Sequence, residues 1–111
     1  MSRFKPTKVR IRENSRIARI AAWKLGTRTM AITLGHTIFL HNASREDFLA
    51  DQSWVCHELA HVYQYRRYGS IRFLALYLWE SFRKGYHNNA LEIEARAAES
   101  DPNLLKGVTF C

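Results

Sequence analysis

The chain has 111 residues, a length that suits one domain and leaves little room for two. Hydrophobic residues make up 47% of the chain and charged residues 24%, a balance that excludes a disordered chain and supplies a packed core. The net charge of +7 favours acidic partners, but the basic residues are scattered and form no clear nucleic-acid-binding motif. We therefore expect a single domain over residues 1–111 with a basic surface.

Residues 1–14 form a basic lead-in, and we expect extended chain there because Pro6 opposes an early helix. This lead-in lacks the apolar region of a signal peptide, and the longest apolar run, residues 73–79, is far short of a transmembrane segment. Two cysteines, Cys56 and Cys111, are too few for a disulfide framework, which fits a reducing compartment. We therefore expect a cytoplasmic protein.

Local patterns then predict one helix and a β-hairpin. Ser15 can cap a helix whose apolar residues recur at helical spacing, and Gly26 can end it. Between residues 29 and 41 the apolar residues alternate instead, with an interruption at Gly35. We expect a β-hairpin that turns near Gly35.

The second half of the chain carries three helical patterns. They cover residues 44–68, 70–84 and 90–100. Asn88 or Asn89 could cap the last of them, and residues 103–111 are a tail with no clear pattern. The predicted fold is α+β, a small twisted sheet with a β-hairpin packed on three to four helices.

One motif in the first of these helices indicates metal chemistry. His57 and His61 are four residues apart, so both imidazoles project from one face of a helix and can reach one ion. Glu58 can take a proton from a water on that ion without binding the ion itself. This H-E-x-x-H pattern is typical of zinc peptidases, and two ordinary surface histidines are the simpler alternative.

A catalytic zinc site needs a third protein ligand. Glu92 and Glu94 point roughly 200° apart on a helix, so only one of them can face the ion. Position alone favours Glu92 and leaves Glu94 as the alternative third ligand. The other candidates are three histidines and a glutamate: His36, His41, His87 and Glu99.

The motif, together with residues 89–95, resembles the gluzincins, zinc peptidases whose third ligand is a glutamate on a downstream helix. It is most similar to the minigluzincins, their miniature members. Residues 31–40 also resemble the peptidase-like core domain of bacterial toxins and contractile injection systems. The resemblance covers residues 29–98 and implies a minimal zincin-like fold.

The resemblance also implies roles for single residues. Glu92 would be the third ligand because it opens the family's E-x-x-A pattern, although Glu94 opens the same pattern two residues later. Arg96 stands where the family often has an aspartate that holds a ligand histidine, and such partners tune metal affinity. The strand at residues 37–40 would form the upper rim of the cleft, where an extended peptide pairs with it.

We therefore expect one Zn²⁺ per chain and hydrolysis of a peptide or protein substrate, with Glu58 as general base and acid. Tyr86 could support the oxyanion through a hydrogen bond. Cys111, at the end of the tail, could enter the cleft and occupy the fourth position on zinc, which would make the protein a latent zymogen.

Two other functions remain open at this point. The first is a catalytically weak or inactive, zinc-stabilised protein-binding module, which Arg96 and the small size favour. The second is a basic protein that binds nucleic acid or a membrane surface through the N-terminal arginines and the helix at residues 70–84. The sequence does not indicate an oligomeric state.

Overall fold

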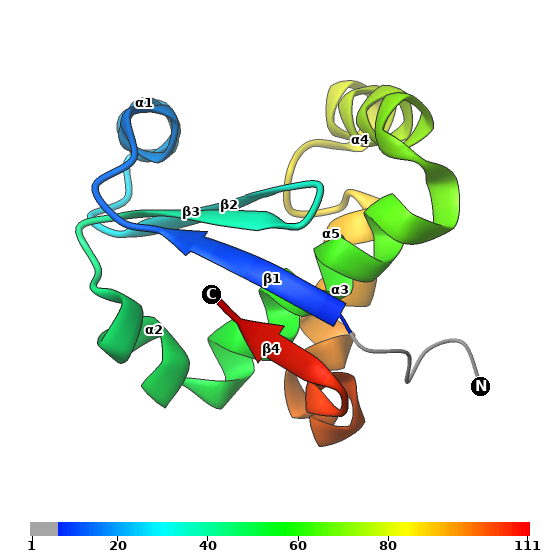
Figure 1. The fold of residues 1–111 in the computed structure, drawn as a ribbon. Coiled ribbons are helices and arrows are strands. Elements are labelled where there is room, and N and C mark those ends of the chain that lie inside the picture. Colours follow the sequence, from blue (N-terminus) through cyan, green and yellow to red (C-terminus); the bar gives the residue numbers. More distant parts are fainter. Residues whose placement is uncertain (1–6) are drawn as a thin grey trace.

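The chain forms a four-stranded mixed sheet with helices around it (Figure 1). The structure, a computed structural model, describes residues 7–111. The strands are β1 (Thr7–Arg12), β2 (Met30–Leu34), β3 (Thr37–His41) and β4 (Val108–Phe110). The helices are α1 (Arg16–Leu25), α2 (Arg45–Ala50), α3 (Gln52–Tyr68), α4 (Ser70–Lys84), α5 (Ala90–Ala97) and the 3-10 helices η2 (Ala98–Ser100) and η3 (Pro102–Leu105). None of the helices in this range has the length and apolarity needed to cross a membrane.

The four strands pair in the order β2-β3-β1-β4. β2 and β3 form the predicted antiparallel hairpin, and Gly35 supplies the left-handed backbone, with a φ of 63°, that the tight turn requires. β1 runs parallel to both of its neighbours, with Ile11 opposite Ile38 of β3 and Val9 opposite Phe110 of β4. Within residues 7–111, β2 is therefore an edge strand and β3 an interior strand.

The basic lead-in predicted for residues 1–14 contributes an interior strand of the sheet, β1. Val9 and Ile11 are buried, and the three basic residues of this strand alternate with them on the exposed face. The tail at residues 103–111 likewise contains most of η3 and all of β4. Both pairings of β1 are parallel and join segments far apart in the sequence, so no local pattern reveals them. Residues 1–6 of the lead-in lie outside the described residues.

The core lies between the sheet and the helices α2 and α3, which cover one face of the sheet (Figure 1). α1 lies on the other face, where it contacts β2 and β3 and buries only two alanines. The core residues come from both layers: Val9, Ile11, Ile38, Leu40, Phe48, Val55, Leu59 and Val62. The α+β prediction is confirmed, with five α-helices in the described range where three to four were expected.

The helix predicted over residues 44–68 is in fact two helices, α2 and α3. Asp51 between them has an extended backbone, and its side chain accepts a hydrogen bond of 3.2 Å from the N–H of Trp54. Because aspartate is a favourable N-cap, it starts a new helix here instead of continuing the old one. This cap fixes where the motif-bearing helix α3 begins.

Candidate metal centre

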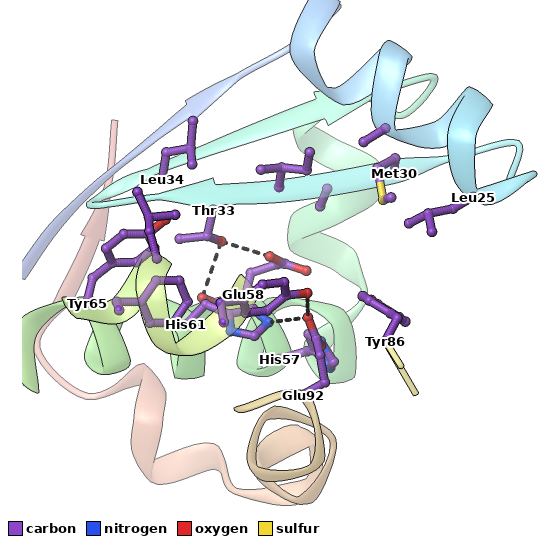
Figure 2. Close-up of a pocket in the computed structure, with 16 residues that line it drawn as sticks. Leu25, Met30, Thr33, Leu34, His57, Glu58, His61, Tyr65, Tyr86 and Glu92 are labelled. Atoms are coloured by element: carbon purple, nitrogen blue, oxygen red, sulfur yellow. Dashed lines mark hydrogen bonds and ion pairs between the residues drawn. The ribbon is translucent and has the colours of Figure 1, made fainter. Parts of the chain in front are cut away.

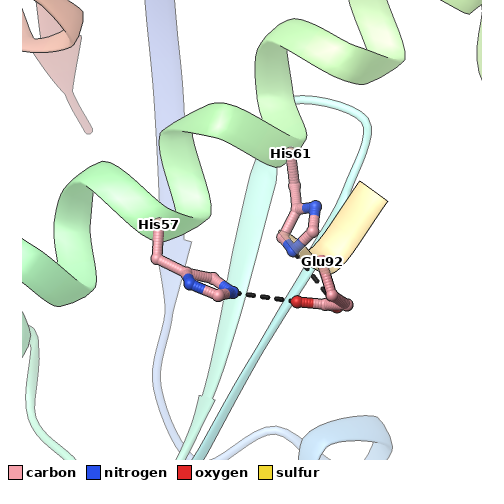
Figure 3. A group of neighbouring side chains, drawn as sticks. All are labelled: His57, His61 and Glu92. Atoms are coloured by element: carbon pink, nitrogen blue, oxygen red, sulfur yellow. Dashed lines mark hydrogen bonds and ion pairs between the residues drawn. The ribbon is translucent and has the colours of Figure 1, made fainter. Parts of the chain in front are cut away.

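Three side chains from two helices meet where α3 faces α5 (Figure 3). His57 and His61 project from adjacent turns of α3, with ring centroids 5.2 Å apart. Glu92, in the first turn of α5, places Oε1 3.0 Å from Nε2 of His57 and Oε2 3.3 Å from Nε2 of His61. Within residues 7–111 this is the one group of three histidine, cysteine or acidic side chains whose ligand atoms all lie within 4.8 Å of one another. We call it the metal group.

A buried asparagine positions the helix that carries Glu92. Asn89, the N-cap of α5, accepts a hydrogen bond of 2.8 Å from the N–H of Leu91. Its amide nitrogen donates to the carbonyl of Tyr77 at 3.0 Å and to the hydroxyl of Ser81 at 2.9 Å, so the same side chain ties α5 to α4. Of the two asparagines that the sequence left open as caps, the structure therefore selects Asn89.

Hydrogen bonds on the far side of each imidazole leave Nε2 as the atom that faces Glu92. Nδ1 of His57 lies 2.8 Å from Oε2 of Glu99, and Nδ1 of His61 lies 2.8 Å from Oε1 of Gln64. A carboxylate oxygen and an amide oxygen only accept, so each Nδ1 carries a hydrogen and each neutral ring presents the lone pair of Nε2. Two imidazole nitrogens and a carboxylate that converge are the donors of a three-ligand zinc site. The residues present therefore fit a zinc ion.

The charges of the metal group depend on one another. Burial alone would lower the pKa of His57, but its hydrogen bond with Glu92 and the nearby charge of Glu58 raise that pKa to about 9. The pKa of His61 is also raised against the effect of burial, chiefly by its interaction with Glu92. Burial would raise the pKa of Glu92, yet its hydrogen bonds with His57 and His61 hold it well below the usual range of a carboxyl. A divalent cation can therefore replace the two Nε2 protons of the metal-free group.

Tyr77 of α4 completes the surroundings of Glu92. Its hydroxyl donates a hydrogen bond to Oε2 of Glu92. Burial and the charge of Glu92 raise the pKa of Tyr77 far above its usual range, so the phenol stays protonated and remains a donor. The sequence marks Tyr77 only as an inward-facing residue, by its spacing of four from the buried Phe73.

Glu58 is buried beneath β2, next to the two histidines (Figure 2). The hydroxyl of Thr33 in β2 donates a hydrogen bond of 2.8 Å to its Oε1. Burial raises the pKa of Glu58, while the charges of His61 and His57 oppose that rise. A carboxyl with a raised pKa is suited to accept and return a proton near neutral pH.

Two pockets that share lining residues form a cleft at the metal group, and Figure 2 shows the first of them. One has a volume of about 300 Å³ and is lined mainly by apolar residues of α1, β2 and α4. The other has a volume of about 350 Å³ and extends to Trp54 and Glu99. His57, Glu58 and Tyr86 line both pockets, so the motif lies where the two meet.

The strand beside the cleft is β2, and the expectation that residues 37–40 form the rim is wrong. β2 contributes all five of its residues to the lining of the first pocket, whereas β3 contributes none. β3 also lies between β2 and β1, so both of its edges are already paired. An extended peptide can add only to a strand with an unpaired edge, which beside this cleft is β2.

Glu94, the alternative third ligand, lies outside the metal group. Its carboxylate accepts a hydrogen bond of 2.6 Å from the amide nitrogen of Gln64 and forms an ion pair of 3.3 Å with Arg67. Because Gln64 in turn holds Nδ1 of His61, Glu94 is connected to the metal group through Gln64. Glu92 faces both histidines directly.

The other candidate residues are not part of the metal group. Tyr86 lines the cleft, and burial together with the charge of Glu92 raises the pKa of its phenol to about 12. Cys111 lies beside β1, where its N–H donates to the carbonyl of Val9 at 2.8 Å, so the tail is not brought into the cleft on the β2 side. Three histidines considered as ligands are outside the metal group: His36, His41 and His87.

A sequence model of the eCIS core domain, a domain of the extracellular contractile injection system, matches residues 3–69, more than half of the chain. The chain belongs to the eCIS core domain family. The match spans β1 to α3 of this eCIS core domain and includes His57, Glu58 and His61, whereas Glu92 lies beyond it. No curated protein and no solved structure gives a significant match to the chain.

The gluzincin pattern has an aspartate where this eCIS core domain has Arg96. Here the carboxylate that binds one of the two histidines comes from another residue, Glu99. Arg96 donates a hydrogen bond to the carbonyl of His87 and does not hold a ligand histidine. Glu99, in the 3-10 helix η2 that follows α5, accepts the hydrogen bond from Nδ1 of His57 instead. Glu99, which the sequence left open as a third ligand, is therefore a hydrogen-bond partner of His57.

Proposed function

We propose that this eCIS core domain is a zinc-dependent peptidase that binds one Zn²⁺ through His57, His61 and Glu92. The observation that supports this proposal most strongly is the convergence of the two Nε2 atoms on the carboxylate of Glu92. Both Nδ1 atoms are occupied by hydrogen bonds, so the rings are fixed in the tautomer that a metal ligand needs.

Glu58 is the proposed general base and acid. A zinc ion held by the metal group would polarise the carbonyl of a peptide and lower the pKa of a water molecule. The hydrogen bond from Thr33 to Oε1 orients the carboxylate of Glu58 and leaves Oε2 to take a proton. From that atom the proton can pass to the nitrogen of the departing amine.

The cleft suits an extended peptide or protein segment as substrate. The edge of β2 can pair with the substrate backbone, and the apolar pocket between α1, β2 and α4 can receive a side chain. Tyr86 lines both halves of the cleft and keeps its phenol protonated, so it can donate a hydrogen bond to an oxyanion.

The test compares peptide hydrolysis and zinc content in the wild type and in Glu58→Gln. We expect Glu58→Gln to keep its zinc and to lose about 10²- to 10⁴-fold in hydrolysis rate, because only the proton-transfer group is removed. Glu46→Gln, at an exposed carboxylate of α2, is the matched control and should change neither quantity.

The outcomes separate the peptidase from the protein-binding module. If the wild type binds zinc and hydrolyses no peptide in a broad library, the protein is the zinc-stabilised binding module. If Glu58→Gln hydrolyses peptides as fast as the wild type, the activity does not arise from this site.

A further inference from the structure

Two helices turn their large apolar side chains toward solvent. α4 buries only Phe73, and Ile71 and Phe82 are 87% and 85% exposed. α1 buries only two alanines, and Trp23 is 79% exposed. A helix that packs one side on its own protein normally presents polar residues on the other side. These exposed apolar stripes indicate a surface that meets a partner.

The exposed residues are aligned on each helix. Ile71, Leu78 and Phe82 recur after seven and four residues, so they form one line along α4, opposite Phe73. On α1, Ile20 lies opposite the buried alanines, with Ile17 and Trp23 on either side of it. Both helices lie on the same side of the sheet (Figure 1). We call these six residues the docking surface.

Basic residues surround the docking surface. α1 carries two arginines and a lysine and no acidic residue, and α4 carries two arginines and a lysine. The one acidic residue of α4, Glu80, is bound to Lys84 at 3.2 Å and to the N–H of Ala90 at 2.9 Å. The exposed basic residues of β1 point to the face of the sheet that α1 occupies, because Val9 and Ile11 point to the other. A matching partner is therefore both apolar and negatively charged.

We propose that the docking surface binds the interface of a membrane that contains anionic lipids. Helices that lie in such an interface combine a polar side rich in arginine and lysine with exposed tryptophan, phenylalanine and leucine. Arg83, with its guanidinium 5.6 Å from the ring centroid of Trp79, can reach lipid phosphates while the ring enters the headgroup region. A lipid surface also adapts to two separate helices without the shape complementarity that a protein partner would need.

A second copy of the chain fits this surface less well. Each copy carries a net charge of +7, and pairing two docking surfaces would bring their basic residues together. A soluble acidic protein would satisfy the charges, and the experiment distinguishes it from a membrane. Membrane binding does not depend on the proposed peptidase activity.

The experiment is co-sedimentation of the purified chain with lipid vesicles. We expect binding to vesicles of phosphatidylcholine mixed with phosphatidylglycerol, and at least tenfold weaker binding to phosphatidylcholine alone. Salt should weaken the binding, because each basic residue near an anionic surface contributes roughly fivefold to the affinity at low ionic strength. No sedimentation with the anionic vesicles would overturn the proposal.

Variants separate lipid insertion from simple attraction of charges. The double variant Ile71→Gln and Phe82→Gln, at two exposed positions of α4, should weaken binding to anionic vesicles at least tenfold while the circular dichroism spectrum stays unchanged. Leu49→Gln, an exposed apolar position on α2 across the sheet, is the matched control and should bind as the wild type does. Should the double variant not fold, Arg16→Gln with Arg19→Gln tests the same surface through its charges.

Three results would contradict the membrane proposal. Unchanged binding by both double variants would place the lipid contact elsewhere on the chain. The chain could instead bind soluble polyglutamate as tightly as the vesicles and lose that binding in the Ile71→Gln and Phe82→Gln variant. That result would indicate an acidic protein partner. A concentration-dependent dimer that the apolar variant abolishes would indicate a second copy of the chain.

Discussion

The imidazole of His57 lies between two carboxylates, Glu92 on Nε2 and Glu99 on Nδ1. The first is a proposed metal ligand, and the second fixes the ring so that Nε2 faces Glu92. Partners of this kind raise the basicity of a ligand and lower the entropy that it loses on binding. Glu99 can therefore be tested separately from the ligands themselves.

We predict that Glu99→Ala weakens zinc affinity about 10- to 100-fold, because the ring loses its orientation. Glu99→Gln should recover part of that loss, since an amide oxygen still accepts the hydrogen bond from Nδ1. A competition titration with a chromophoric chelator measures both affinities, and Glu46→Ala, on the exposed side of α2, serves as control. Wild-type affinity in Glu99→Ala would show that the hydrogen bond from Nδ1 does not support the metal.

The raised pKa of His57 also predicts how the metal-free protein responds to pH. Its folded pKa of about 9 lies above the usual histidine value of 6.5, so the stability it contributes is fully present below about pH 6.5 and is lost as pH rises through about 9. The lowered pKa of Glu92 acts in the opposite sense, since its contribution is present above about pH 4.5 and is lost as pH falls. The metal-free protein should therefore be most stable between about pH 4.5 and about pH 6.5.

We predict that this protein loses up to about 3 kcal/mol of unfolding free energy between pH 6.5 and pH 9 in the presence of a chelator. With zinc the trend should reverse, because the metal competes with protons for both histidines. Urea titrations across this range measure both trends. A metal-free stability that stays constant or rises with pH would contradict the assigned pKa shift.

The sequence determines some of these residues and not others. His57 and His61 follow from a spacing of four on a helix. Position together with the family pattern favours Glu92 over Glu94, and Glu92 is the residue that lies with the two histidines. The hydrogen bond from Tyr77 to Glu92 could not be predicted from the sequence. A tyrosine that only packs in the core would occupy the same position in the helical pattern. The hydrogen bond between Glu99 and His57 could not be predicted either, because it depends on where the 3-10 helix η2 begins.

Among the secondary-structure elements, α5 depends most on a single side chain. Asn89 is fully buried and both caps α5 and binds α4. Glu92 lies in the first turn after this cap, so its position depends on how the helix starts. The neighbouring Asn88 is exposed and offers a matched control.

We predict that Asn89→Ala lowers the unfolding free energy by about 1–3 kcal/mol, because it removes the cap and leaves buried polar groups without a partner. Zinc affinity should fall as well, since Glu92 loses its fixed position. Asn88→Ala should leave both quantities within experimental error of the wild type. Thermal unfolding and zinc titration of the two variants give the comparison, and equal effects would show that α5 is not held by its cap.

Element prediction succeeded where the signal was local. The hairpin of β2 and β3 and the motif helix follow from a change of period and an apolar stripe, and both are present in the structure. The division of residues 44–68 at Asp51 was missed, because a helical pattern continues on both sides of this cap. β1 and β4 were missed because each pairs in parallel with a partner distant in sequence.

For the whole molecule, strand order decides what the cleft can bind. Because β1 and β4 add to one side of the hairpin, β3 becomes an interior strand and β2 is left as the edge beside the metal group. This order could not be derived from the hairpin alone, which is why the rim was assigned to the wrong strand. The same order directs Cys111 to the opposite edge of the sheet.

If His57, His61 and Glu92 hold one zinc ion, the metal content per chain depends on each of these three side chains. Inductively coupled plasma mass spectrometry measures the zinc content after dialysis against limiting zinc. The proteins compared are the wild type, His57→Ala, Glu92→Ala and Glu94→Ala. We expect one zinc per chain in the wild type and in Glu94→Ala, and little or none in His57→Ala and Glu92→Ala. A wild type that takes up no zinc, or a Glu92→Ala variant that keeps it fully, would rule out a zinc site made of these three residues.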